Sequence, residues 1–135
     1  APRGDPDSSA HYPSKVLYAE GLYRAIELVA ALKKPIFITE NGGPAQDSAL
    51  LEEFMQKHLY VIWKAMQEGY PVCGYLYWSL TDCFCWRRGY ANKHGIFEVD
   101  FQTKRRTYRP AFDYFVSLIA KSRGIVNFKS ITLDV

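Results

Sequence analysis

Two stretches of the sequence bring carboxylate, amide and indole groups to the ends of apolar runs. In PIFITENGG the apolar run stops at Glu40 and Asn41, a carboxylate followed by an amide. In PVCGYLYWSLTDCFCW the second run leads into two indoles, Trp78 and Trp86, with an aspartate, hydroxyl groups and thiols between them. A carboxylate at the end of a buried strand is costly unless its charge is used. Carbohydrate sites use this combination, because sugar rings stack on aromatic faces while carboxylates and amides bind their hydroxyl groups. The two stretches are therefore candidate parts of a carbohydrate site.

Alternating strand and helix patterns position these stretches. The elements expected in chain order are a helix over 15–32, a strand over 35–39, a helix from 48 to about 68, a strand from 71, an irregular loop over 83–95, an extended excursion with a turn near 102–103, and a last helix from 110. Asp47 or Ser48 is expected to cap the second helix, and Gly69 to end it. The residues expected on the inward helix faces are Leu22, Ile26, Val29, Ala30, Leu51, Phe54, Met55, Leu59, Ile62, Trp63, Met66, Phe112, Phe115, Leu118 and Ile119.

Continuous apolar strands separated by amphipathic helices predict a parallel sheet covered on both faces. The order is that of a βα repeat, either doubly wound or barrel-like. Two parallel strands alone leave both edges of a sheet unpaired, so we expect one partial barrel domain over 1–135 or an obligate assembler. Residues 1–13 are expected to be irregular, and 125–135 form a tail without a predicted element.

Composition and charge exclude several classes of function. The 135 residues carry a net charge of +3, and the basic residues are scattered, so no nucleic-acid partner is expected. No apolar run approaches the roughly 20 residues of a membrane span, and the polar N-terminus shows no signal region. Three cysteines in no disulfide pattern favour a reducing, cytoplasmic location. Cys83 and Cys85 have no second pair at zinc spacing, so neither a metal nor another cofactor is expected. The chain does not begin with methionine, which suggests a processed or partial chain.

Three motifs in order resemble the final segments of family 1 glycoside hydrolases, the β-glucosidase family. PIFITENGG, GYLYWSLTDCFCW and GYANKHGIFEVDFQTKRRTYRP are similar to the family's I-T-E-N-G, W-S-L-x-D-N-F-E-W and G-Y…G-L…V-D patterns, and the resemblance extends over roughly 17–120. It implies a (β/α)8 TIM barrel, an α/β fold of which this chain supplies strands 7 and 8 with their helices. It also implies a retaining β-glycosidase that acts on β-glycosides or oligosaccharides, with Glu40 as the catalytic nucleophile.

The resemblance also implies roles for the neighbouring residues. Trp78 matches a tryptophan that contacts the glycone, and Trp86 matches a second sugar-facing indole. Asn41 is interpreted either as a residue that orients Glu40 or as a turn residue before Gly42. Asp82 matches an acidic position whose expected role is structural, hydrogen-bonding the loop.

The retaining mechanism needs a second carboxyl group, about 5–5.5 Å from the nucleophile, which acts as acid and then as base. The resemblance places it in an asparagine-glutamate-proline motif after strand 4, and this sequence contains no such motif. The chain therefore lacks half of the catalytic pair. We expect it either to need a missing N-terminal portion of the barrel or to self-associate.

Departures from the family pattern fall in the glycone pocket. Cys83 and Cys85 stand where the family has asparagine and glutamate, and that glutamate accepts hydrogen bonds from the glycone 4- and 6-hydroxyl groups. A thiol at Cys85 is a weak substitute. One alternative is a 6-phospho-β-glycosidase, because Cys85 is small and Arg87, Arg88 and Lys93 are near it in sequence. Another is a truncated or degenerate relative that binds a sugar or a partner without catalysis. A flavodoxin-like domain is less favoured, because NGGPAQ is a poor phosphate-cradling turn.

Overall fold

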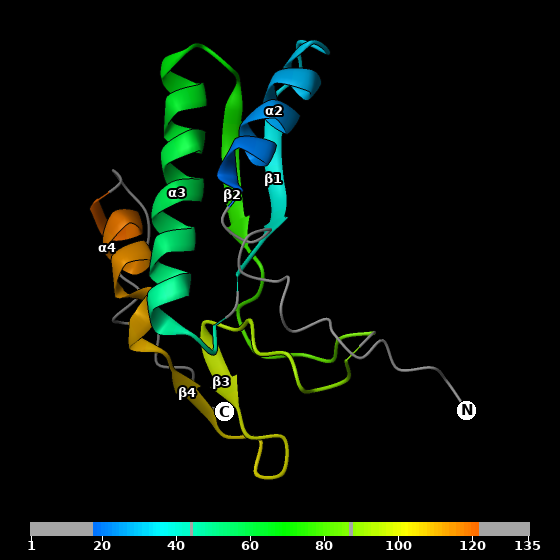
Figure 1. The fold of residues 1–135 in the computed structure, drawn as a ribbon, viewed down its shortest axis with the longest axis vertical. Coiled ribbons are helices and arrows are strands. Elements are labelled where there is room, and N and C mark those ends of the chain that lie inside the picture. The colour runs from blue at the N-terminus through cyan, green and yellow to red at the C-terminus, as the bar shows by residue number, and fades with distance from the viewer. Residues whose placement is uncertain (1–17, 44, 87, 122–135) are drawn as a thin grey trace.

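The computed structural model describes residues 18–43, 45–86 and 88–121 (Figure 1). The elements in chain order are α2 (Ala19–Ala30), β1 (Ile36–Asn41), α3 (Ser48–Gln67), β2 (Val72–Tyr77), β3 (Phe97–Val99), β4 (Arg106–Tyr108), the 3-10 helix η1 (Pro110–Phe112) and α4 (Asp113–Lys121). The order expected from the sequence is confirmed. The expectations for 1–13 and 125–135 lie outside the described residues.

The ends of α3 follow from its capping residues. The Asp47 carboxylate accepts a hydrogen bond from Leu50 N at 3.0 Å, which satisfies one of the free N–H groups of the first turn. At the other end Gly69 has a φ of +88°, a left-handed conformation that glycine adopts without a steric penalty. Of the two expected caps, Asp47 is therefore the one used.

The sheet brings β1 and β2 side by side in parallel. Ile36 lies opposite Val72 and Ile38 opposite Tyr75, and the register shifts between Ile38 and Asn41. Helix α3 forms the crossover that two parallel strands require. The excursion that follows is a hairpin in which Phe97 of β3 lies opposite Tyr108 of β4. Strands β3 and β4 form a separate pair below the parallel sheet in Figure 1.

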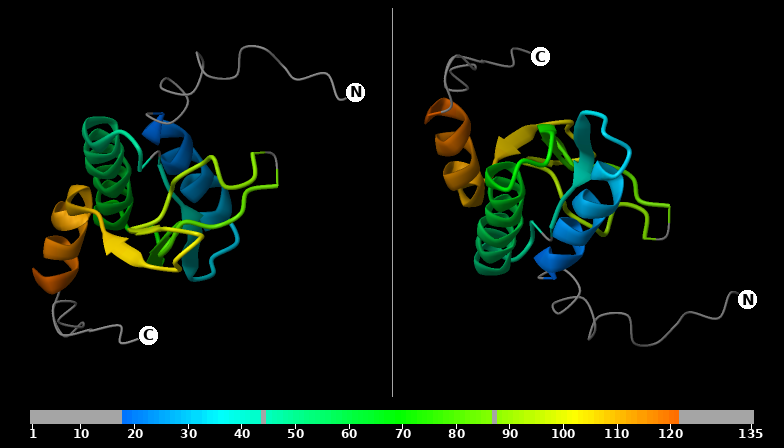
Figure 2. Two further views of the ribbon diagram at one scale, coloured as in Figure 1. Left: turned by 90° about the horizontal axis from the view of Figure 1, so that it is seen from below. Right: turned by 90° about the horizontal axis from the view of Figure 1, so that it is seen from above.

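Two apolar clusters hold these elements together. The first joins α2, α3 and one face of the sheet, so both helices lie on the same side of the strands (Figure 2); its buried members are Ile26, Ile36, Ile38, Ile62, Ala65 and Val72. The second joins α3 to η1 and lies toward the carboxyl ends of the strands; its buried members are Ala45, Leu51, Phe54, Met55 and Phe112. Most of the inward faces expected for α2 and α3 are thereby confirmed.

Four expected core positions are wrong. Val29, Trp63, Met66 and Leu118 are exposed among the described residues. On α3 the buried stripe runs through Leu51, Phe54, Met55, His58, Val61, Ile62 and Ala65. Trp63 follows the buried Ile62 by one position, about 100° further around the helix, and Met66 lies at the edge of the stripe in the last turn of α3.

The other face of the sheet is open in the part of the chain that the structure describes. Phe37 on β1 is 60% exposed and Leu76 on β2 is 58% exposed. The expectation of a sheet covered on both faces is therefore not met by these residues alone. Within the same described ranges, no helix combines the length and apolar character needed to cross a bilayer.

Candidate functional site

The carboxyl ends of β1 and β2 meet where the sequence places its reactive groups. Trp78 N donates a hydrogen bond to Asn41 O at 3.1 Å, just beyond the paired strands. Gly42 passes so close to the Trp78 carbonyl that a Cβ atom on it would lie 1.8 Å from that oxygen. Only glycine fits this crossing, because any side chain would collide with backbone. The structure thus brings the segment of Glu40 and Asn41 against Trp78.

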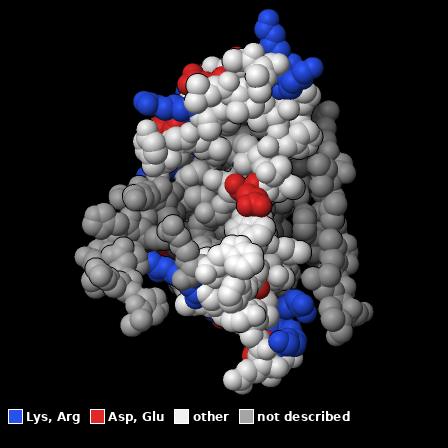
Figure 3. Space-filling model, turned by 90° about the vertical axis from the view of Figure 1, so that its right-hand side faces the viewer, with Lys and Arg blue, Asp and Glu red and all other residues white. Residues whose placement is uncertain are grey.

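Glu40 is an exposed residue next to the last position of β1. Among the described residues, no hydrogen bond or ion pair engages its carboxylate. Figure 3 views the side of the molecule that lies to the right in Figure 1, the side of β1, and shows an acidic group in mid-face with uncharged side chains next to it. Because Glu40 is exposed and has no such partner among the described residues, its carboxylate is open to a ligand.

Asn41 is fixed to the neighbouring strand. Its side-chain oxygen accepts a hydrogen bond from Tyr75 Oη at 3.0 Å, and the same hydroxyl lies 3.2 Å from Asn41 O. Burial raises the pKa of Tyr75, so the hydroxyl stays protonated and remains a donor. The contact anchors the end of β1 to β2 immediately after Glu40.

Trp78 follows the last residue of β2 and belongs to neither apolar cluster. Its side chain is 45% exposed, and the Trp78–Ser79 peptide bond is cis. Ser79 turns inward and is buried, with its hydroxyl donating to Thr81 O at 2.8 Å. The indole is thus presented at the strand edge rather than packed among the described core residues.

The loop over 83–95 projects from the body in every view (Figures 1 and 2). Trp86 is 95% exposed, and its ring meets that of Phe84 edge-on at 6.0 Å. Cys85 is half-buried, and its sulfur lies 3.9 Å from Asn92 Nδ2. No hydrogen bond or ring contact joins Cys85 or Trp86 to Glu40 in the described residues. In the described residues these two predicted sugar contacts are therefore not in direct contact with Glu40.

The last residues of the loop return between the two strand ends. His94 Nδ1 lies 3.1 Å from Gly43 O, and His94 O accepts from Ser79 N at 3.4 Å. Lys93 O accepts from Ala45 N at 3.0 Å. The segment beyond β1 and the segment beyond β2 are thus both attached to the same returning backbone.

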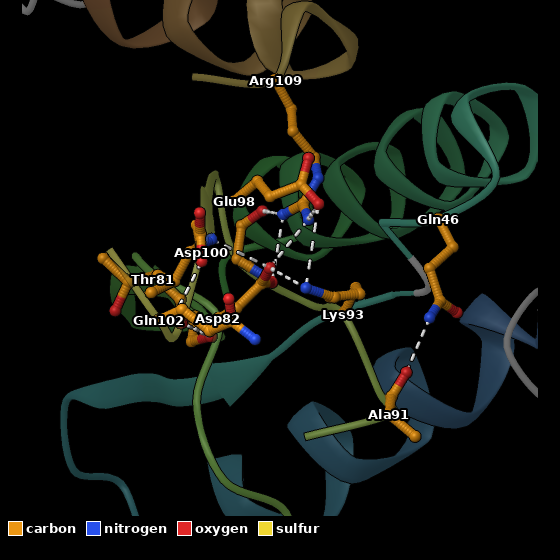
Figure 4. A network of polar contacts seen from close by, with 12 residues as sticks. Gln46, Thr81, Asp82, Ala91, Lys93, Glu98, Asp100, Gln102 and Arg109 are labelled. Atoms are coloured by element: carbon orange, nitrogen blue, oxygen red, sulfur yellow. Dashed lines mark hydrogen bonds and ion pairs between the residues drawn. The ribbon is translucent and has the colours of Figure 1, made fainter. Parts of the chain in front are cut away.

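A buried carboxylate closes the base of the loop (Figure 4). The Asp82 side chain has no exposed surface and receives two hydrogen bonds from Arg109, Nη1 to Oδ1 at 3.1 Å and Nη2 to Oδ2 at 2.8 Å. Gly95 N donates to Oδ1 at 2.9 Å, and Val99 N donates to Oδ2 at 3.3 Å. Lys93 Nζ lies 3.5 Å from Oδ2. The expected structural role of Asp82 is thereby confirmed.

The ionised state of Asp82 is secured by these partners. Burial acts to raise its pKa, but the hydrogen bonds and charge of Arg109, with the N–H groups of Gly95 and Val99, outweigh burial and hold the pKa of Asp82 below its ordinary value. Sequence reasoning missed Arg109 as the partner. A buried acid needs a cationic partner, so the sequence could predict that one exists, but it could not identify which arginine or lysine it is.

The described residues form no metal-binding centre. Within 18–43, 45–86 and 88–121, no group of three His, Cys, Asp or Glu side chains is arranged to hold an ion. Cys73, Cys83 and Cys85 are all free thiols. What the described site offers is carboxylate, amide and aromatic surface.

Comparison with known proteins supports the family resemblance of the sequence motifs. The family model of glycosyl hydrolase family 1 matches residues 4–124. Beta-glucosidase A of Thermotoga maritima is 35% identical over an alignment of 118 residues that covers 78% of this chain and 26% of that protein. The beta-galactosidase of Pyrococcus woesei is 37% identical over 93 residues, 69% of this chain and 18% of its own. The chain thus spans about a quarter or less of the length of these curated relatives.

Solved structures superpose on most of the chain. The beta-glycosidase from Thermosphaera aggregans superposes with a TM-score of 0.71 at 40% identity, covering 82% of this chain and 23% of that one. The beta-glycosidase from Pyrococcus horikoshii gives a TM-score of 0.68 at 37% identity, covering 70% and 22%. The predicted fold class is confirmed as a portion of a TIM barrel, and the described residues form no closed barrel.

Proposed function

Because the chain belongs to glycosyl hydrolase family 1, we propose that the protein containing it hydrolyses β-glycosidic bonds with retention, using Glu40 as the nucleophile. The observation that supports this most is the strand-end crossing, where Gly42 lies against the Trp78 carbonyl and Glu40 stands exposed beside it. In this mechanism the Glu40 carboxylate attacks the anomeric carbon and the leaving group departs as a covalent glycosyl-enzyme forms. Water then releases the sugar with its original configuration.

The second carboxyl of the pair comes, in this proposal, from outside the 135 residues. It has to reach within about 5–5.5 Å of Glu40 to protonate the leaving group and then to activate water. Trp78 supplies an aromatic face for the glycone, and Asn41 holds the end of β1 in place through Tyr75. Cys85 alters the pocket, since a thiol is a poor acceptor for the glycone hydroxyl groups. The glycone preference is therefore expected to differ from that of relatives with glutamate at this position.

The test is hydrolysis of an aryl β-glucoside by the longest natural chain that carries this sequence. Glu40→Gln keeps the shape of the side chain and removes the nucleophile, so kcat should fall by more than about a thousandfold. Glu53→Gln is the matched control, because Glu53 lies on the outer surface of α3, paired with Lys57 at 2.6 Å. NMR of the first-formed sugar should show the β-anomer. Equal rates for Glu40→Gln and the wild type, or an α-anomer as first product, would sink the assignment.

A 6-phosphorylated substrate is a less favoured alternative. The candidate phosphate ligand Lys93 already lies 3.5 Å from Asp82 Oδ2 and 3.7 Å from Glu98 Oε1, and its ammonium group stands 5.5 Å from the centre of the Phe101 ring. Two nearby carboxylates partly neutralise the Lys93 ammonium group, so it attracts a phosphate less strongly. Comparing kcat/KM for an aryl β-glucoside with that for its 6-phosphate separates the two hypotheses, and we expect the unphosphorylated substrate to be preferred.

The open sheet face supports a further part of the proposal. Phe37, Leu76 and Leu80 leave large apolar side chains exposed around the strands. We propose that the remaining barrel covers this face in a longer chain, and that residues 1–135 alone self-associate. Sedimentation at micromolar concentration should show a larger species for the isolated residues. A stable monomer would contradict this part and would leave the proposed reaction untouched.

A further inference from the structure

We propose that the Asp82–Arg109 ion pair is a positioning device for the loop over 83–95, holding Cys85 and Trp86 for sugar binding without touching the sugar. The inference rests on the proposed glycosidase function. It concerns the affinity for the sugar rather than the chemical step, which belongs to Glu40 on β1.

The ion pair grips both ends of the loop. Asp82 immediately precedes the loop, and Gly95 is its last residue. Gly95 N donates to Asp82 Oδ1 at 2.9 Å, while the Arg109 guanidinium donates to Gly95 O as well as to both Asp82 oxygens. A Cβ on Gly95 would lie 2.2 Å from Asp82 N, so the two ends are in direct backbone contact. One guanidinium therefore closes the base of the whole loop.

Little else in the described structure fixes the loop. None of its described residues, 83–86 and 88–95, belongs to either apolar cluster. Its other attachments to the body are the partly exposed ring contact of Tyr90 with Phe101 and a set of polar contacts, among them Gln46 Nε2 to Ala91 O at 2.8 Å and His94 Nδ1 to Gly43 O at 3.1 Å. A segment without buried apolar contacts takes its position from hydrogen bonds and ion pairs, and so it is sensitive to their loss. The buried pair is the strongest of these.

A row of ring contacts links the ion pair to Trp86. Lys93, beside Asp82, stands over the Phe101 ring at 5.5 Å, and Phe101 meets the Tyr90 ring at 4.2 Å. Tyr90 contacts Phe84 at 5.3 Å, and Phe84 contacts Trp86 at 6.0 Å. Displacing Lys93 or the loop base is thus expected to move the indole that the proposal assigns to sugar binding.

The experiment compares Arg109→Gln, Arg109→Lys and Arg106→Gln in the longest natural chain. Arg106 is the matched control, because it is exposed on β4 and, among the described residues, its guanidinium reaches only Lys104 O at 3.5 Å. The rate of chymotrypsin cleavage under native conditions reports how firmly the loop is held. Phe84, Trp86 and Tyr90 are cleavage sites within the loop, and none of the variants alters them. Steady-state kinetics on an aryl β-glucoside read KM and kcat.

Arg109→Gln should speed cleavage within the loop and raise KM about tenfold, with kcat changed less than about threefold. Arg109→Lys should recover part of both effects, because lysine keeps the charge but not the two-pronged hydrogen bond. Arg106→Gln should behave as wild type. Lys93→Met, a milder change at the edge of the network, should shift both readouts in the same direction and serves if Arg109→Gln does not fold.

Two results would overturn the inference. One is unchanged loop cleavage and unchanged KM in both Arg109→Gln and Lys93→Met. The other is cleavage spread over the chain with KM and kcat lost together, which would make the pair a general stability element. A wild-type chain that does not hydrolyse the glucoside would refute the proposed function instead, and the chymotrypsin comparison would still decide whether the pair holds the loop.

Discussion

Replacing Gly42 with alanine tests whether the crossing of the two strand ends sets the candidate active site. The added Cβ would lie 1.8 Å from the Trp78 carbonyl oxygen and 2.8 Å from its carbon, where real Cβ atoms come no closer than 3.0 Å. The obstacle is backbone and not the end of a flexible side chain, so the segments must part by more than 1 Å. The hydrogen bond from Trp78 N to Asn41 O, now 3.1 Å long, would be lost.

The size of the effect follows from that displacement. A shift of about 1 Å between groups that act on one substrate costs roughly a hundredfold in rate. This corresponds to about 2.7 kcal/mol of transition-state stabilisation, at about 1.36 kcal/mol per factor of ten. Overpacking of this kind typically costs about 1–3 kcal/mol of folding free energy, which a whole barrel can tolerate. The Gly42→Ala protein should therefore fold and show a kcat/KM about a hundredfold below the wild type.

The assay is hydrolysis of an aryl β-glucoside by the longest natural chain, with thermal unfolding measured in parallel. Gly69→Ala is the control, because Gly69 has a φ of +88°, a Cβ added to it would meet nothing within 4 Å, and it lies at the opposite end of β2. It should lose roughly 1 kcal/mol of stability from backbone strain and keep its activity. A Gly42→Ala protein with wild-type kcat/KM would refute the reasoning, as would an equal loss of activity in Gly69→Ala.

Three further predictions concern stability. Phe112→Ala should lower the free energy of unfolding by about 3–5 kcal/mol in urea, because Phe112 is fully buried and meets the Tyr77 ring edge-on at 4.9 Å. Asp47→Ala should cost about 1 kcal/mol by losing the cap of α3, and Asp47→Ser should restore most of it. Burial lowers the pKa of His58 below its ordinary 6.5, against the opposing Phe54 carbonyl and Glu20. The unfolded chain therefore takes up the proton first, so stability should be complete above pH 6.5 and fall as the pH drops below it. His58→Gln should flatten that part of the Tm-against-pH curve, and an unchanged slope would contradict the assignment.

Local patterns were sufficient to predict the elements, while the choice between adjacent apolar residues needed tertiary contacts. Asp47 and Gly69 mark the ends of α3 by chemistry that acts within one turn. Trp63 is as apolar as its neighbour Ile62, and only the packing of α2 and the sheet on one stripe of the helix leaves it outside. Sequence reasoning that counts apolar residues at steps of three and four cannot make this distinction.

The candidate site likewise contains residues that local patterns could predict and one that they could not. Glu40 and Trp78 were predictable, because parallel strands bring their carboxyl ends to a common edge. The partner of Asp82 was not, since Arg109 lies 27 residues downstream and shares no local pattern with it. A buried ion pair between segments that are distant in sequence depends on the fold, so its second residue can be identified only from the structure.

The closed base of the loop makes the segment above it exchangeable. Ile96 N donates to Ser79 O at 2.9 Å, and Phe97 N donates to Leu80 O at 2.9 Å, so the chain that leaves β2 and the chain that returns are joined before the loop begins. Residues 83–91 therefore form a cassette, a segment whose two ends are held by backbone hydrogen bonds between residues outside it. Recognition can diverge within such a cassette while the scaffold stays the same. Cys83 and Cys85 lie inside it, so under the proposed function glycone preference would change there at little cost to the barrel.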